Sequence, residues 1–112
     1  ILMRKENIFN EFEFENIYFV IGTCFDKNSD QMIKFLNSIK NSHIYLTETP
    51  VKTLALENYS DFAKSEAESL SKNPIELLDQ AVEKSSDNDL IIITGSLYLT
   101  GLIKQKLAEL SY

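Results

Sequence analysis

The stretch that decides the fold is Asp89-Leu-Ile-Ile-Ile-Thr-Gly-Ser-Leu-Tyr-Leu99. Its residues 90–94 are apolar or β-branched without interruption, which is typical of a strand buried on both faces of a sheet. Gly95 and Ser96 break this strand, and apolar residues then recur at helical spacing, namely Leu99, Leu102, Ile103, Leu107 and Leu110. The segment therefore predicts a buried strand, a tight turn and a final helix.

Two earlier segments predict strands of the same kind. Residues 17–21 form a continuous apolar run that ends at Gly22, and residues 43–47 are a short β-branched and aromatic run. A further short strand at 68–71 stays an open possibility. Each strand is separated from the next by enough residues for a helix, so parallel pairing with crossover connections is expected.

Helical patterns fill the intervals between the strands. Residues 28–40 carry Met, Phe, Leu and Ile at helical spacing, and residues 55–70 carry an apolar stripe at intervals of three and four. Asn73 followed by Pro74 is a typical helix start, and the helix is expected to end near Ser85. The sequence thus predicts a Rossmann-like, three-layer α/β domain with a mainly parallel sheet flanked by helices.

The first residues are expected to precede this domain. Ile1, Leu2 and Met3 are apolar at the start of the chain and resemble the end of a truncated helix, while residues 7–16 resemble a connecting loop. We therefore expect residues 1–16 to be the end of a helix and a loop, residues 17–112 to be the α/β domain, and the chain to be part of a longer protein.

Composition excludes several classes of function. The 112 residues are 44% hydrophobic, enough for one core, and the formal charge of −6 with no lysine and arginine cluster disfavours nucleic-acid or anionic-membrane partners. No apolar run approaches the roughly twenty residues that span a bilayer. Cys24 cannot form an internal disulfide, and with only His43 to help it cannot form a zinc site. A soluble protein of the reducing cytoplasm is expected.

Ligands of open α/β sheets bind beyond the carboxyl ends of the strands, which here follow residues 21 and 94. After the first strand, Asp26 and Lys27 can contact a substrate or a neighbouring domain, or lie in a solvated turn. After the last strand, Gly95 allows close backbone approach, and Ser96 opens a helix whose amides suit a carboxylate or phosphate. An ordinary serine cap explains Ser96 equally well.

Other reactive groups have structural interpretations. Cys24 is expected to be a small buried residue, His43 to be structural, and Asp87, Asp89 and the glutamates of 11–15 to be solvated charges. The chain contains neither type of glycine-rich phosphate loop, no histidine pair and no Gly-x-Ser-x-Gly elbow. No catalytic residue, metal site or cofactor is therefore assigned to this chain, and a self-sufficient kinase, dehydrogenase or hydrolase is not expected.

Three motifs resemble one enzyme family. The C-terminal Leu90-Ile-Ile-Ile-Thr-Gly-Ser-Leu-Tyr is the most specific, and it resembles the ending of the folylpolyglutamate synthase and dihydrofolate synthase family. Phe19-Val-Ile-Gly-Thr-Cys-Phe-Asp-Lys and Lys52-Thr-Leu-Ala-Leu-Glu are similar to two earlier segments of that family. The resemblance covers roughly residues 17–110 and implies a C-terminal domain of the Mur ligase superfamily.

The resemblance also implies a function. Such enzymes use ATP and Mg²⁺ to join L-glutamate to a folate or to dihydropteroate; which of the two stays open. A P-loop central domain of the same polypeptide would form the acyl phosphate, so the isolated chain would be inactive. By resemblance, Ser96 with the amides of Ser96 and Leu97 would hold a glutamate carboxylate beside Gly95, and Asp26 and Lys27 would lie at the interdomain face.

The sequence departs from the family pattern in places. The Asp-Gly-Ala-His-Asn type motif and the P-loop domain with its carbamylated lysine are absent from this chain. Phe25 stands where a lysine is common and Lys52 where an arginine is common, so no role is transferred to either. The alternative function is a free-standing Rossmann-like binding or regulatory module without catalytic activity.

Overall fold

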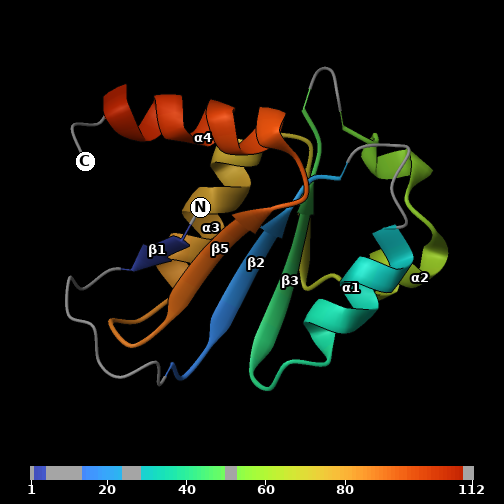
Figure 1. Ribbon diagram of the computed structural model, residues 1–112, viewed down its shortest axis with the longest axis horizontal. Helices are drawn as coiled ribbons and strands as arrows, with labels where there is room; N and C mark the ends of the chain where they lie inside the picture. The colour runs from blue at the N-terminus through green and yellow to red at the C-terminus, as the bar shows by residue number, and fades with distance from the viewer. Residues whose placement is uncertain (1, 5–13, 24–28, 50–52, 110–112) are drawn as a thin grey trace.

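A computed structural model describes residues 2–4, 14–23, 29–49 and 53–109. These residues form a five-stranded sheet in the order β1-β5-β2-β3-β4. Figure 1 shows β1, β5, β2 and β3 side by side in this order. The strands are β1 (Leu2–Arg4), β2 (Ile17–Ile21), β3 (Ser42–Thr47), β4 (Ser69–Ser71) and β5 (Leu90–Thr94). Strands β2 to β5 are mutually parallel, and β1 pairs antiparallel with β5. The predicted mainly parallel sheet is confirmed, and the open possibility of a strand at 68–71 is confirmed as β4.

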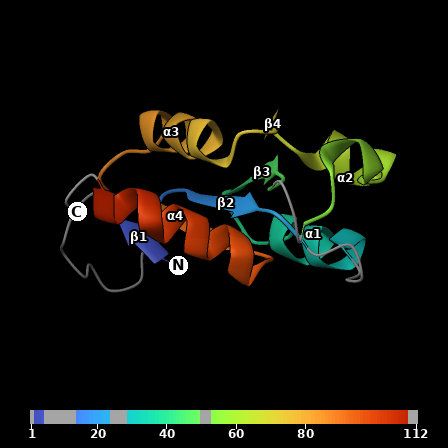
Figure 2. The ribbon, with the colours of Figure 1, turned by 90° about the horizontal axis from the view of Figure 1, so that it is seen from above.

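Helices cover both faces of this sheet. They are α1 (Ser29–Asn37), α2 (Asp61–Glu66), α3 (Pro74–Lys84) and α4 (Leu97–Glu109), with a short 3₁₀ helix, η1 (Leu56–Asn58). Figure 2 shows α1 and α3 on opposite sides of β2 and β3, which is the predicted three-layer arrangement. In the described part of the chain, no helix combines the length and the apolar character needed to cross a membrane.

The continuous apolar runs of the strands follow from burial on both faces. On β2, Tyr18 and Val20 pack into a cluster with side chains of α3 and α4, which we call the α3–α4 core. Their neighbours Phe19 and Ile21 point the other way, into a cluster with side chains of α1 and α2, which we call the α1–α2 core. Because successive side chains of a strand alternate between faces, a strand covered on both sides needs apolar residues at every position.

The predicted helix at 55–70 is wrong. The segment divides into η1, a single short helix α2 and strand β4. Ser60 caps α2 by accepting a hydrogen bond from the Ala63 amide at 3.0 Å. The backbone is extended at Ala67, where the helix ends, and the next amide, that of Glu68, donates to the Ile44 carbonyl at 2.7 Å. Tyr59 and Ala63 both enter the α1–α2 core, so separate elements produced the helical spacing.

The first residues also differ from the prediction. Leu2–Arg4 is a strand paired with β5, not the end of a helix. An edge strand leaves a row of unpaired backbone groups, and β1 satisfies those of β5. The predicted connecting loop lies partly outside the described residues.

Asp89 is not the solvated charge that the sequence predicts. Its side chain is 3% exposed, while Asp87 is exposed as expected. Oδ1 of Asp89 accepts hydrogen bonds from the backbone N (3.0 Å) and Nδ2 (3.2 Å) of Asn16, and Oδ2 accepts from the Ser86 amide at 2.7 Å. These donors, from the residue before β2 and from the loop before β5, compensate the carboxylate for its own burial.

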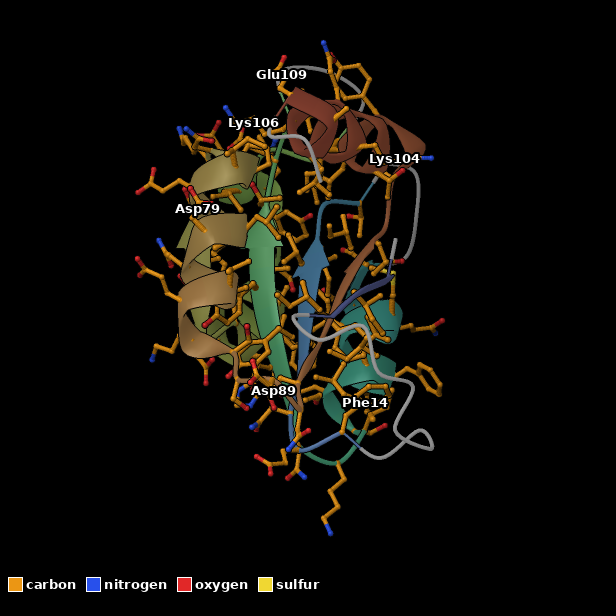
Figure 3. All side chains as sticks on the ribbon, turned by 90° about the vertical axis from the view of Figure 1, so that its left-hand side faces the viewer. Phe14, Asp79, Asp89, Lys104, Lys106 and Glu109 are labelled. Carbon is orange, nitrogen blue, oxygen red and sulfur yellow. The ribbon has the colours of Figure 1, made fainter. Side chains whose placement is uncertain are left out.

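Asp89 belongs to a polar group at the amino ends of the parallel strands, far from α4 in Figure 3. We call it the amino-end network, and it comprises Asn16, His43, Tyr45, Glu68 and Asp89. His43 places Nε2 at 2.9 Å from Asn16 Oδ1 and Nδ1 at 3.0 Å from Glu68 Oε1. Glu68 also hydrogen-bonds the Tyr45 phenol. His43 therefore has structural contacts, as expected.

Tyr45 provides a pH test of this network. Burial raises the pKa of Tyr45 to about 12, with smaller contributions from the charge of Glu68, from Tyr18 and from the Glu68 hydrogen bond. An unfolded tyrosine ionises near pH 10, so the folded state holds the phenolic proton more tightly. The stability that Tyr45 contributes is fully present below about pH 10 and should fall by about 2 kcal/mol as the pH rises to about 12.

Urea denaturation between pH 9 and 12 measures this effect. Tyr45→Phe should be less stable than the wild type at pH 9 because it lacks the phenolic hydrogen bond, yet the difference should shrink or reverse by pH 12. Tyr98→Phe, which removes a phenol that is 42% exposed, is the control and should run parallel to the wild type. Parallel curves for Tyr45→Phe would contradict the prediction.

Candidate functional site

The carboxyl ends of β2 and β5 lie where open α/β sheets bind their ligands. The two strands are parallel neighbours, with Ile21 opposite Thr94. After β2 the chain leads to α1, which contributes to the α1–α2 core, and after β5 it enters α4, which contributes to the α3–α4 core. Adjacent strands whose connections leave toward opposite faces mark the switch point of the topology.

Two glycines meet at the ends of these strands. Gly95 has a φ of +105°, and a Cβ atom built on it would lie 2.8 Å from the Gly22 carbonyl oxygen. The Gly22 amide bonds the Thr94 carbonyl at 3.2 Å, and a Cβ on Gly22 would lie 3.0 Å from Cδ2 of Leu99. Only glycine fits both the torsion and the contact at position 95.

Ser96 lies directly after this contact and caps α4. Its side chain is 7% exposed, and its Oγ accepts hydrogen bonds from the amides of Tyr98 (3.1 Å) and Leu99 (3.4 Å). The Thr100 amide bonds the Ser96 carbonyl at 3.1 Å and begins the helix. The cap that the sequence allows is therefore present. Leu97 begins α4 beside it.

Buried hydroxyls that the sequence prediction missed line the same edge of the sheet. Thr23 and Thr47 are fully buried, and Thr49 is 4% exposed. The Thr23 amide and Oγ1 both donate to the phenolic oxygen of Tyr59, at 3.0 and 3.3 Å, while the Thr23 carbonyl accepts from Leu54 at 2.6 Å. A threonine at or just after the end of each buried apolar run was the available signal.

Some of the predicted site residues lie together, and others lie outside the described residues. Gly95 and Ser96 lie beside Gly22 and Thr23 at the switch point. Asp26 and Lys27 lie outside the described residues, as do Cys24, Phe25 and Lys52. Their predicted place at an interdomain face stays a prediction.

The described groups at this edge suit anion binding better than proton transfer or metal binding. They offer hydroxyls and the start of a helix, whose amides and dipole favour negative charge. Glu48, which follows β3, uses Oε1 to accept a hydrogen bond from the Leu56 amide at 3.1 Å. No cluster of three or more His, Cys, Asp or Glu side chains in the described segments is suited to a metal ion.

Comparison with known proteins identifies the same architecture elsewhere. No family model and no curated protein matches the sequence. Among solved structures, folylpolyglutamate synthase from Thermotoga maritima superposes with a TM-score of 0.60 over 84% of this chain, at 24% identity. The chain has the fold of part of that enzyme. It spans 21% of the enzyme's length. The fold thus agrees with the family that the sequence motifs resemble.

The contact between Gly95 and Gly22 can be tested by adding a single methyl group. Gly95→Ala should lower the free energy of unfolding by about 1 to 3 kcal/mol, because it combines a positive φ with a collision against backbone. Gly101→Ala, inside α4, is the matched control, since a Cβ there meets nothing within 4 Å. It should stabilise the chain by about 0.5 to 1 kcal/mol. Denaturant unfolding with an equal loss in both variants would overturn this account of the turn.

Proposed function

We propose that this chain is a domain of an ATP-dependent ligase that adds L-glutamate to a folate, to dihydropteroate or to both. The observation that carries the proposal is the position of the Thr94-Gly-Ser-Leu-Tyr98 motif. This family-like motif occupies the turn between β5 and α4, at the switch point of a sheet whose fold matches part of a folylpolyglutamate synthase.

Ser96 is the residue proposed to contact glutamate. Its oxygen already accepts hydrogen bonds from the Tyr98 and Leu99 amides, so its remaining capacity is mainly to donate its own hydrogen. A hydroxyl that can only donate suits a carboxylate and does not suit an ammonium group. The amide of Leu97 and the positive end of α4 would act on the same carboxylate, and Gly95 would let it approach.

The chemistry of ATP would belong to another part of the same polypeptide. Phosphoryl transfer needs a cation-rich cradle, whereas orienting an amino acid needs fixed hydrogen-bond donors. This chain supplies the second kind of group, so a P-loop domain with Mg²⁺ would be its partner, and Asp26 and Lys27 would face that domain. The complete enzyme would act in the cytoplasm, and the 112-residue chain alone would be inactive.

The alternative is a Rossmann-like binding or regulatory module without catalytic activity. It is favoured by one specific observation, because Ser96 caps the Tyr98 and Leu99 amides of the first turn of α4 without any ligand. The encoding gene distinguishes the two functions. A P-loop domain in the same polypeptide supports the ligase, and a reading frame that starts near Met3 favours the module.

The first prediction from this proposal concerns the binding of nucleotide. The isolated chain should give no heat above dilution when titrated with Mg-ATP in a calorimeter, because nothing in its sequence resembles a phosphate cradle. The complete polypeptide, titrated in the same buffer, is the positive control. Micromolar binding by the isolated chain would contradict the proposed division.

The second prediction concerns Ser96 in the complete enzyme. Ser96→Ala should raise the KM for glutamate about ten- to a hundredfold and leave the KM for ATP nearly unchanged, since it removes one hydroxyl donor to a carboxylate. The same change should lower stability by about 1 kcal/mol through loss of the cap. Steady-state kinetics and thermal denaturation of the same samples measure both effects.

Ser96→Asp separates the two roles. Aspartate caps helices as well as serine does, so this variant should keep its stability, but its charge should repel a carboxylate and raise the glutamate KM further. If both variants keep the wild-type glutamate KM and only Ser96→Ala melts earlier, Ser96 is a helix cap and nothing more.

A further inference from the structure

The amino-end network joins the starts of all four parallel strands through consecutive hydrogen bonds. Asp89, before β5, binds Asn16, before β2; Asn16 contacts His43 on β3; and His43 contacts Glu68, before β4. The network lies at the opposite end of the sheet from the candidate ligand site (Figure 3). Nothing in the proposed function uses it.

The hydrogen bonds of Asn16 fix which way its side-chain amide points. Nδ2 donates to the buried carboxylate of Asp89 at 3.2 Å, which leaves Oδ1 facing Nε2 of His43 at 2.9 Å. The reverse orientation would set an oxygen acceptor against a carboxylate, which only accepts. Nε2 of His43 must therefore carry a hydrogen to complete this contact.

The other ring nitrogen faces an acceptor as well. Nδ1 of His43 lies 3.0 Å from Oε1 of Glu68, whose carboxylate also takes part in a hydrogen bond with the Tyr45 phenol. A neutral imidazole has a hydrogen on one nitrogen only, whereas the imidazolium has a hydrogen on both. Both contacts of His43 are thus complete only when the ring is doubly protonated.

We propose that His43 is a protonation-dependent hydrogen-bond bridge that holds the edge strand β4 to the rest of the sheet. With two ring hydrogens it bridges Asn16 and Glu68. After loss of one proton the ring can donate to only one of them, and the other contact becomes two acceptors in opposition. The bridge is therefore complete when both ring nitrogens carry a hydrogen and is broken when one of them is deprotonated.

The groups around the ring support this assignment. They are the stacked ring of Tyr18 on β2, the carboxylates of Glu68 and Asp89, the phenol of Tyr45, and Lys84, whose carbonyl accepts from the Tyr18 hydroxyl. Tyr18 lies flat against His43, with centroids 4.6 Å apart, where an aromatic face attracts a cation. The pKa of Tyr18 is raised by burial and then by Asp89 and Glu68, which places two negative charges near the ring. Lys84 is solvent-exposed.

The geometry of β4 explains why one contact matters there. β4 has only three residues, and the Glu68 amide that precedes it bonds the Ile44 carbonyl at 2.7 Å. Glu68 is therefore held to β3 at its backbone and, through His43, at its side chain. Short edge strands open more readily than central ones, so losing the side-chain contact should be seen first in β4.

His43 is the single histidine of the chain, so its ring signals can be observed without interference. In ¹⁵N NMR of the folded chain at about pH 5.5, we expect two ring N–H protons that exchange slowly with water. Glu68→Gln should lose the slow exchange at Nδ1 and keep it at Nε2. A ring with a single proton at that pH, or with both protons in fast exchange, would overturn the proposal.

Amide hydrogen exchange tests whether this bridge stabilises β4. After correction for the intrinsic pH dependence of exchange, protection of Glu68 and Leu70 should fall about tenfold between about pH 5.5 and 8.5, while Val20 in the centre of β2 stays constant. His43→Gln cannot take up a proton and should abolish this dependence. If that variant does not fold, the wild-type comparison decides alone, and equal protection of β4 at both pH values refutes the proposal.

Discussion

The contact between Gly22 and Gly95 is the constraint on which the rest of the structure depends. The two backbones approach so closely that a methyl group on Gly95 would lie 2.8 Å from a carbonyl oxygen. This approach lets β5 turn directly into α4 while β2 leads to α1, so the helices that follow two neighbouring strands join different cores. Leu99 fills the space left by the absent side chain of Gly22, and the start of α4 is thereby fixed over the sheet.

The two ends of the sheet use polar groups for different purposes. At the amino ends, charged and amide side chains bond one another across strands, and Asp89 is nearly fully buried to do so. At the carboxyl ends, buried hydroxyls such as Thr23 and Ser96 bond local backbone and the Tyr59 phenol. Hydroxyls both accept and donate, so one that accepts from backbone amides, as Ser96 does, can complete a fold and still offer a hydrogen to a ligand. A buried carboxylate with several donors has no such reserve.

Local signals predicted the parts of the fold that local interactions determine. Pro74 after an Asn73 cap gave the start of α3, and the uninterrupted runs gave β2 and β5 because both faces are covered. The division of residues 55–70 was missed because β4 exists only through its pairing with β3, which local spacing does not contain. Asp89 and the contact of Thr23 with Tyr59 were missed for the same reason, since their partners are 73 and 36 residues away.

The charge of the chain limits how its proposed site can work. With a formal charge of −6, the domain repels anions at long range, so a carboxylate could be held only by short-range donors in fixed positions. The first turn of α4 has that character, because Ser96 is buried and oriented by two amides before any ligand arrives. On the proposed function a triphosphate would be bound elsewhere, because neutral donors alone do not balance its charge. The cations that its chemistry requires would then come from the P-loop domain, and neither part would suffice without the other.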